Sequence, residues 1–295
     1  YYTLRGRTKK ERRLLWVRIP QPGITERKYR NENIDRVNNR SCILLDGNQG
    51  RYSMTPILDY NSYNSGMKKS LEDKLFFLPV LQDKICTLLD YGCADGQLLK
   101  EIQSRDLGIR LIGYDINEDM IFRARENNPE IHFSSHIDRI SSLIGSSRTA
   151  LLLSSVIHEV YSYQTEEGIE QFWNFVLSTG FEYLIIRDLC VSEETERAAD
   201  PQDLLKLFIY GYRNQMEDFT NIWGPISSQK KLIHFLMKYR YVSNWEREVR
   251  ENYLPLNIED LIAKVSEKYR VIYQKHYALP FLQEQVEKDF GIVLE

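Results

Sequence analysis

The residues best suited to chemistry lie in one short segment, Asp90-Tyr91-Gly92-Cys93-Ala94-Asp95-Gly96. The segment follows an apolar run, 85–89, and precedes residues 97–102, which have helical spacing. A glycine turn between a strand and a helix brings backbone N–H groups and a helix N-terminus against a ligand. A second acidic residue, Asp115, ends the next apolar run, 111–114. The spacing therefore predicts two strands that each end in a polar group able to meet a ligand.

This pattern resembles the class I S-adenosylmethionine (SAM)-dependent methyltransferases, whose first motif is an acidic residue followed by glycines at alternate positions. Asp90, Gly92 and Gly96 match that motif, and Ala94 replaces its middle glycine. Alanine is a mild departure because it still lets the backbone come close to a ligand, provided that its φ is negative. The resemblance covers residues 76–189 and implies an enzyme that uses SAM as its cofactor.

The resemblance also assigns roles to individual residues. Gly92 and Gly96 would let the turn pass close to the methionine part of SAM, and Asp90 would hold that turn or meet the ammonium group. Asp115 would accept hydrogen bonds from two ribose hydroxyls, because a carboxylate is acceptor-only and has two oxygens. Adenine would lie against residues 136–138. The predicted cofactor-binding residues are Asp90, Gly92, Cys93, Ala94, Gly96, Asp115, Ile116, Ile137, Asp138, Ser154 and Ser155.

The ends of the fourth and fifth predicted strands supply the candidate catalytic residues, which are His158, Glu159 and Asp188. His158 is the best candidate for a general base, since histidine titrates near working pH. Alternatively, His158 lines the pocket, or it is a structural residue at a helix start with Glu159 as a helix-dipole partner. Arg187 and Asp188 would face the same cleft and bind a substrate amine or carboxylate, or they form an ordinary salt-bridged strand end.

Two other functions compete with methyl transfer. A nicotinamide-binding Rossmann domain uses the same geometry, but its fingerprint G-x-G-x-x-G is broken here by Ala94 and by the bulky Gln97. A methyltransferase-like module without catalysis, serving as a binding domain in a larger chain, is the second alternative. The intact set of Asp90, Gly92, Gly96 and Asp115 argues against it.

Short apolar runs alternate with segments of helical spacing through the middle of the chain. This alternation predicts an α/β fold with a doubly wound, mostly parallel sheet of the seven-stranded type and helices on both faces. The five main strands are expected at 85–89, 110–114, 131–133, 149–156 and 183–187. A sixth is expected at 269–273. A seventh, antiparallel strand is expected after it, which is either short, at 290–294, or lost by truncation of the chain.

Helical patterns at 201–214, 227–239 and 257–268 predict a helical insertion after the fifth strand, which would form a cap over the substrate side. The predicted organisation has four parts. They are a basic N-terminal extension or linker at 1–66, a SAM-binding Rossmann-like core at 67–190, the helical cap at 191–266 and the C-terminal part of the core sheet at 267–295.

Composition limits the class of protein. The 295 residues are 42% hydrophobic and 27% charged, as in globular proteins, and no run reaches the length of a membrane span. The four cysteines lack metal-ligand spacing and suit a reducing compartment. The start of the sequence is basic and polar, unlike a signal peptide. We therefore expect a cytoplasmic protein with no metal and no membrane partner.

The net charge of −3 hides an asymmetry, because residues 1–40 carry twelve Lys and Arg against four Asp and Glu. A basic arm on an acidic body suits a nucleic-acid contact, or an arm that docks on its own acidic body. The sequence thus predicts methyl transfer to an O or N atom of a small or modest polar substrate. The alternative is an RNA or DNA methyltransferase guided by residues 1–40.

Overall fold

The computed structural model describes residues 12–18, 71–144, 148–276, 278 and 280–294. Except for strand β1 (Arg12–Arg18), the predicted extension at 1–66 lies outside the described residues. The nucleic-acid contact predicted for residues 1–40 falls on this part of the chain and stays a prediction.

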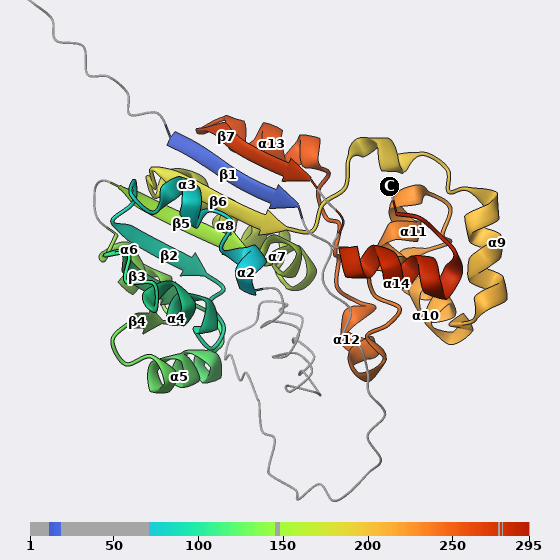
Figure 1. Ribbon diagram of the computed structural model, residues 1–295, viewed down its shortest axis with the longest axis horizontal. Coiled ribbons are helices and arrows are strands. Elements are labelled where there is room, and N and C mark those ends of the chain that lie inside the picture. Colours follow the sequence, from blue (N-terminus) through green and yellow to red (C-terminus); the bar gives the residue numbers. More distant parts are fainter. Residues whose placement is uncertain (1–11, 19–70, 145–147, 277, 279, 295) are drawn as a thin grey trace, which may run out of the picture.

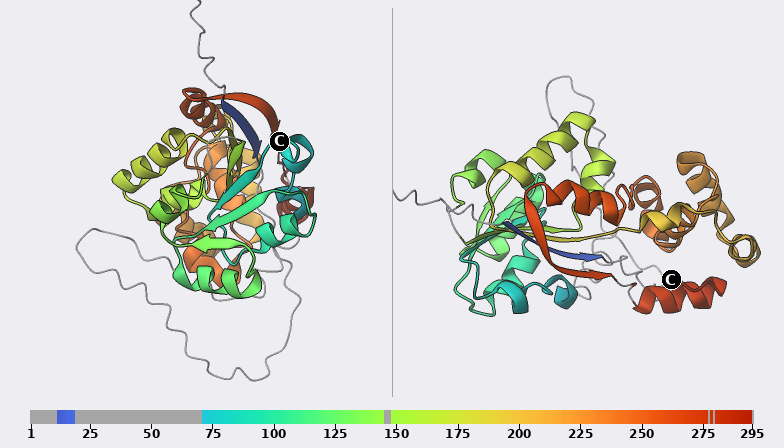
Figure 2. Two further views of the ribbon diagram at one scale, coloured as in Figure 1. Left: turned by 90° about the vertical axis from the view of Figure 1, so that its left-hand side faces the viewer. Right: turned by 90° about the horizontal axis from the view of Figure 1, so that it is seen from above.

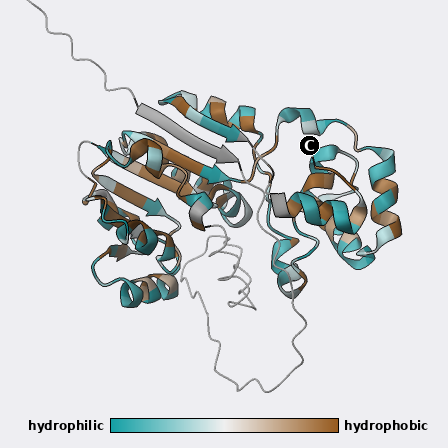
Figure 3. Cartoon of the chain, in the orientation of Figure 1, coloured by the Kyte–Doolittle hydropathy of each residue, from teal (hydrophilic) through white to brown (hydrophobic). Residues whose placement is uncertain are grey.

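Five consecutive parallel strands make up most of one sheet, in the order β4-β3-β2-β5-β6 with β4 at the edge (Figure 1). They are β2 (Thr87–Tyr91), β3 (Arg110–Tyr114), β4 (His132–Ser134), β5 (Thr149–Ser154) and β6 (Tyr183–Asp188). Their apolar runs are nearly continuous because a parallel strand is covered on both faces. Figure 3 shows this apolar character along β5 and β6. The predicted mostly parallel α/β sheet is confirmed.

Two further strands continue the sheet beyond β6. β1 pairs in parallel with β6 on one side and with β7 (Tyr269–His276) on the other. The strand predicted at 269–273 is therefore present as β7. The antiparallel strand predicted at 290–294 is wrong, because Phe290 ends helix α14 (Pro280–Phe290) and residues 291–294 form no strand. A short apolar run does not by itself distinguish a strand from a helix end.

Helices cover both faces of the sheet, since successive strand residues point to opposite sides. Leu151 and Leu184 join one buried cluster, whereas their neighbours Leu152 and Ile185 join another. The first face carries α6 (Ile137–Ser141), α7 (Ile157–Tyr163), α8 (Glu166–Ser178) and α13 (Ile258–Ser266). The opposite face carries α2 (Leu71–Lys74), α3 (Leu78–Leu81), α4 (Gln97–Gln103) and α5 (Glu118–Asn127).

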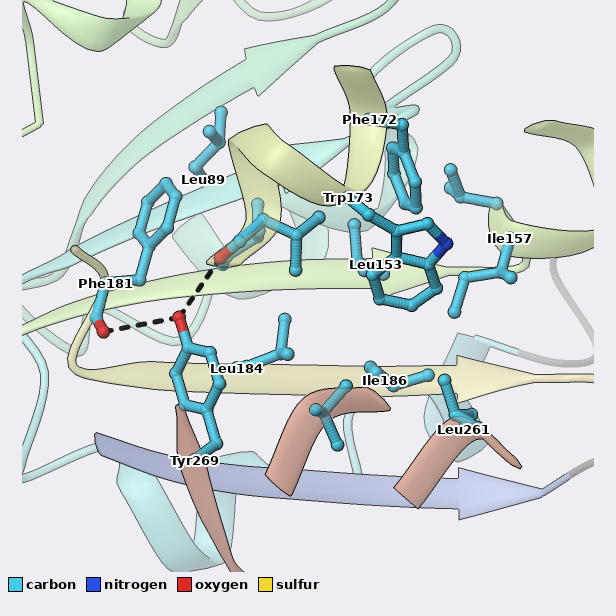
Figure 4. Packing of buried hydrophobic residues seen from close by; sticks show 14 of the residues in the cluster. Leu89, Leu153, Ile157, Phe172, Trp173, Phe181, Leu184, Ile186, Leu261 and Tyr269 are labelled. Carbon is cyan, nitrogen blue, oxygen red and sulfur yellow. Dashed lines mark hydrogen bonds between the residues drawn. The ribbon is translucent and has the colours of Figure 1, made fainter. Parts of the chain in front are cut away.

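The first face is packed by large side chains. Trp173 of α8 and Leu261 of α13 lie over the strand residues Leu153 and Ile186 (Figure 4). The Tyr269 hydroxyl reaches the backbone carbonyls of residues 176 and 181, at 3.2 and 3.4 Å, so its buried polar end is satisfied. Figure 2 shows the sheet between its two helical layers.

A separate helical group lies beyond the carboxyl ends of β6, β1 and β7 (Figure 1). It contains α9 (Pro201–Tyr210), α10 (Arg213–Trp223), α11 (Gln229–Leu236), α12 (Trp245–Glu248) and α14, with two short 3₁₀ turns, η1 (Glu193–Glu196) and η2 (Val242–Asn244). These elements enclose a third apolar cluster. The predicted helices are present, but α13 packs on the sheet, and α14, which the sequence assigned to the core sheet, packs in the helical group.

In the part of the chain that the structure describes, no helix combines the length and apolar character needed to cross a lipid bilayer.

Candidate functional site

The strand order defines the place where a ligand is expected. The chain runs from β2 to β3 and β4 on one side, then returns to β5 on the other side of β2. In open parallel sheets, ligands bind outside the carboxyl ends of the strands at such a reversal of strand order. The turn at 92–96 follows β2 directly and leads into α4. The predicted glycine turn therefore lies at this reversal.

Asp115 joins the ends of β2 and β3. Its Oδ2 accepts the Ala94 N–H over 2.8 Å, and its Oδ1 accepts the Asn117 N–H over 2.9 Å. The Gly92 N–H donates to the Tyr114 carbonyl over 2.7 Å. Burial raises the pKa of Asp115 and the two backbone donors oppose that shift. Because a carboxylate has about four acceptor positions, Asp115 keeps capacity for further donors.

The turn itself is left-handed at three positions. Gly92 and Gly96 have φ of +82° and +79°, and Ala94 has φ of +47°. The condition under which alanine would be a mild departure, a negative φ, is not met. A Cβ on Gly92 would lie 2.6 Å from Val156 Cγ2, and one on Gly96 would lie 2.8 Å from Phe133 Cζ. Both glycines are therefore required by backbone conformation and by the packing of protein side chains.

The remaining candidates for cofactor binding also lie at carboxyl ends of strands, but their side chains differ in how exposed they are. The Cys93 side chain is buried in the core, close enough to Gly113 that a Cβ there would lie 2.8 Å from its Sγ. Only the backbone of Cys93 is therefore available to a ligand. Ile116 is 50% exposed beside Asp115. Ile137 and Asp138 begin α6, just after β4, with Ile137 partly buried and Asp138 exposed.

The end of β5 contains two serines in different environments. The Ser154 Oγ is buried and has no hydrogen-bond partner among the residues that the structure describes. Ser155 has φ of +62°, a conformation that is costly for a residue with a side chain, and its Oγ accepts from Arg187 Nη1 over 3.1 Å. Arg187 also donates to Asp73 Oδ2 from Nη2 and Nε, over 2.8 and 3.1 Å.

The sequence did not identify Lys74 as part of this region. Asp90 is buried, and this raises its pKa to about 7, opposed by the charge of Lys74. Burial likewise lowers the pKa of Lys74 to about 7. The available signal was its spacing: Lys74 falls with Leu71, Leu75 and Leu78 on the apolar side of a helical pattern, where a lysine is unusual. Asp90 at the end of β2 and Lys74 of α2 are thus both buried, and the charge of each shifts the pKa of the other.

Arg187 and Asp188 do not face the same cleft, which corrects the sequence-based expectation. They are adjacent on β6, so their side chains point to opposite faces of the sheet. Asp188 accepts the backbone N–H groups of Val156 and Ile157 with Oδ2, over 2.9 and 2.6 Å, at the start of α7. Its Oδ1 accepts the Leu189 N–H and the His158 Nδ1–H over 2.8 and 2.6 Å. These four donors fill the acceptor capacity of the carboxylate.

His158 is held inside the protein, with 1% of its surface exposed. Burial lowers its pKa, but the charge and hydrogen bond of Asp188 outweigh burial, and with Glu159 and Glu251 they raise the pKa of His158 to about 9. An imidazole with this pKa is already protonated at neutral pH and has no vacant site for a substrate proton. His158 and Asp188 therefore fix α7 to β6.

Glu159 is the predicted catalytic residue that keeps contact with solvent, since 36% of its side chain is exposed. Its Oε1 lies 3.4 Å from Arg247 Nη2 of α12. Arg247 Nε donates to Glu251 Oε1 over 2.7 Å, and the Tyr163 hydroxyl donates to the same oxygen over 2.6 Å. Partial burial raises the pKa of Glu159 to about 7, opposed by Arg247. This network connects α7 to the helical group.

No family model matches the chain, and the search of curated proteins gave no match. Among solved structures, the plantazolicin methyltransferase BamL, in complex with a desmethyl analogue and SAH, aligns at 14% identity over 71% of this chain and 66% of its own, with a TM-score of 0.39. The bifunctional kinase-methyltransferase WbdD aligns at 22% identity over 46% of this chain and 30% of its own, with a TM-score of 0.31. The methyltransferase domain of bacterial CtHen1 aligns at 16% identity over 39% of this chain and 61% of its own, with a TM-score of 0.31. Likeness at this level carries no functional argument, and this chain spans less than a third of WbdD.

Proposed function

We propose that this chain binds SAM at the carboxyl ends of β2, β3 and β4 and transfers its methyl group to an O or N atom of a small or modest polar acceptor. The observation that carries the proposal is the Asp115 carboxylate, hydrogen-bonded over 2.8 Å to the Ala94 N–H at the reversal of strand order. This contact holds a hydrogen-bond acceptor for the ribose hydroxyls of SAM beside a left-handed backbone turn that would meet its charged methionine part.

The residues present fit this cofactor. Asp115 has acceptor positions left for ribose hydroxyls beyond its two backbone donors. Ile116 offers an exposed apolar surface next to it for the adenine ring. The backbone at 92–96 would meet the methionine part, and Asp90 with Lys74 would hold that turn from below. Of the two roles considered for Asp90, its burial favours the structural one.

SAM supplies an already activated methyl group, so the main task of the protein is to align the acceptor. The helical group stands beyond the carboxyl ends of β6, β1 and β7 (Figure 1), at the same edge of the sheet as the turn at 92–96, and would hold the acceptor there. His158 and Asp188 support this arrangement indirectly by fixing the start of α7 at the end of β5.

Calorimetric titration with SAM and with S-adenosylhomocysteine (SAH) tests the proposal. We expect both to bind to the wild-type chain, Asp115→Ala to abolish binding, and the exposed-surface variant Glu126→Ala to leave it intact. Incubation with methyl-labelled SAM and fractionated cell extract would then show whether the label enters small molecules, protein or nucleic acid. The absence of binding by both SAM and SAH to a folded wild-type protein would overturn the proposal. Binding without label transfer would favour the non-catalytic module.

A further inference from the structure

One carboxylate interacts electrostatically with both the proposed cofactor site and the helical group. Glu159 lies in the first turn of α7, just after β5. On the sheet side, the charge of Glu159 raises the pKa of Lys74 of α2, and the charge of Asp115 at the end of β3 raises the pKa of Glu159. On the other side it contacts Arg247 of α12. Glu159 thus lies on the helix that follows β5, between the sheet, which carries the proposed cofactor site, and Arg247 of the helical group.

The surroundings of Glu159 differ from those of the neighbouring carboxylates. Asp188 is saturated by four donors, and the Glu251 side chain is 4% exposed with two donors on one oxygen. Glu159 is 36% exposed and receives one long contact on Oε1. Its Oε2 has no hydrogen-bond partner among the described residues. Glu159 thus combines a partly solvent-accessible side chain with a contact to Arg247, a combination that suits a proton-transferring group.

We propose, on the basis of the function proposed above, that Glu159 takes the proton released by the acceptor during methyl transfer. The acceptor O or N atom forms a bond to the methyl carbon while the carbon–sulfur bond breaks. The electron pair of that bond remains on sulfur, giving SAH, and the acceptor proton passes to Glu159 Oε2. The acceptor is then a hydroxyl or amine that carries a dissociable proton.

The charges around Glu159 suit a reversible proton transfer near neutral pH. Arg247 and Glu251 face it from the helical group, His158 from its own helix, Asp115 from β3 and Lys74 from α2. Partial burial, with Glu251 and Asp115, raises the pKa of Glu159, whereas Arg247 and His158 lower it, and the balance is about 7. A group with such a pKa can take a proton and return it to water in each cycle.

Comparison of SAM with SAH tests the position of Glu159 without a known acceptor. The two ligands differ only in the positively charged sulfonium methyl of SAM. The ratio of their affinities therefore reports the charge of protein groups close to the methyl group that is transferred. Between pH 6 and 8 we expect the preference of the wild type for SAM over SAH to rise about tenfold, as a carboxyl group with a pKa near 7 ionises. Glu159→Gln should reduce this rise to what Asp90 and Lys74 contribute, while the exposed-residue control Glu166→Gln should behave as wild type.

The labelled-methyl assay tests the proton transfer itself. Glu159→Gln should lower transfer at pH 7 by about 10²–10⁴-fold while the variant still binds SAH. If Glu159→Gln fails to fold, Glu159→Asp keeps a carboxylate and should keep the pH-dependent ratio with slower transfer. Normal transfer by a folded Glu159→Gln, or a wild-type affinity ratio that does not change with pH, would overturn this inference alone. A wild type that binds neither ligand would instead overturn the proposed function.

Discussion

The sheet and the helical group use buried charge in different ways. In the sheet, the strand interiors are apolar, and charged side chains lie at the carboxyl ends, where Asp188 accepts four hydrogen bonds and Arg187 donates to Asp73 and Ser155. In the helical group, Lys238 is 0% exposed inside the apolar cluster. Its Nζ donates to the Glu251 carbonyl and lies 4.7 Å from the Tyr253 ring centroid.

The difference indicates how each region is stabilised. Burying a charge is costly unless it is well paired, so a charge in the middle of a small helical core contributes a defined geometry more than stability. The sheet instead depends on apolar packing, with its charges fixing loops and helix starts. We therefore expect the two regions to respond differently to substitution and to pH.

The largest expected effect is that of Asp188→Ala. Removing this carboxylate leaves the His158 cation and the N–H groups of Val156 and Ile157 buried without an acceptor, which should lower the free energy of unfolding by about 3–5 kcal/mol. Glu251→Ala in the helical group should cost less, because Arg247 retains Glu159. Urea denaturation compares the two variants. A larger loss for Glu251→Ala would contradict the comparison.

The two regions should also depend on pH in opposite directions. The pKa of His158 is raised to about 9, so its stabilising contribution is complete below about pH 6.5 and is lost as the pH rises through 9. The pKa of Lys238 is lowered to about 7 by burial, so its unfolded state binds more protons above pH 7. The Lys238 contribution should therefore rise between pH 7 and about 10.

Variants of these two residues separate the contributions. Thermal melting of His158→Asn at pH 6, 8 and 9.5 should show a difference from wild type that shrinks as the pH rises. Lys238→Met, which keeps an apolar stem among the aromatic rings, should gain stability relative to wild type as the pH falls. If the melting temperatures of the wild type and both variants changed with pH in the same way, neither group would contribute as described.

A smaller effect is expected from glycine replacements matched for backbone conformation. Gly96 and Gly291 have φ of +79° and +63°, but only a Cβ on Gly96 meets protein atoms, at 2.8 Å from Phe133. Gly96→Ala should cost about 2–4 kcal/mol through strain and overpacking, and Gly291→Ala about 1 kcal/mol through φ alone. Calorimetric melting measures both. Equal costs would mean that Phe133 moves aside without penalty.

The smallest predicted effect concerns the contact between the regions. Ser162 Oγ accepts the Asn252 N–H over 2.7 Å. Ser162→Ala should cost about 1 kcal/mol and speed hydrogen exchange at the Asn252 amide. Exchange at the β5 amides should stay unchanged. Faster exchange throughout the sheet would indicate that the two regions unfold as one unit.

The sequence predicted elements well where the signal was local. Apolar runs located β2, β3, β5 and β6, because buried parallel strands are hydrophobic over their whole length. Asp115 was placed at a strand end by counting from the glycine turn, and the structure brings it to Ala94. These predictions required no knowledge of which distant residues meet.

Contacts between distant residues could not be predicted in this way. Arg187 and Asp73 are 114 positions apart, and Arg247 and Glu159 are 88 apart. No periodicity indicates such pairs, so His158 was favoured as a base by its residue type and by its place after a predicted strand. The left-handed φ of Ala94 was also hidden, since alanine ordinarily avoids that conformation.

Among the elements that the structure describes, the chain passes between the sheet and the helical group three times, after β6, before α13 and between β7 and α14. The first two passages run side by side, with the Ile258 N–H donating to the Val191 carbonyl over 2.9 Å. Because three connections join the helical group to the sheet, a hinge motion of the helices away from the sheet requires all three connections to bend together. The position of Arg247 in the helical group relative to Glu159 on the sheet side therefore depends on all three connections.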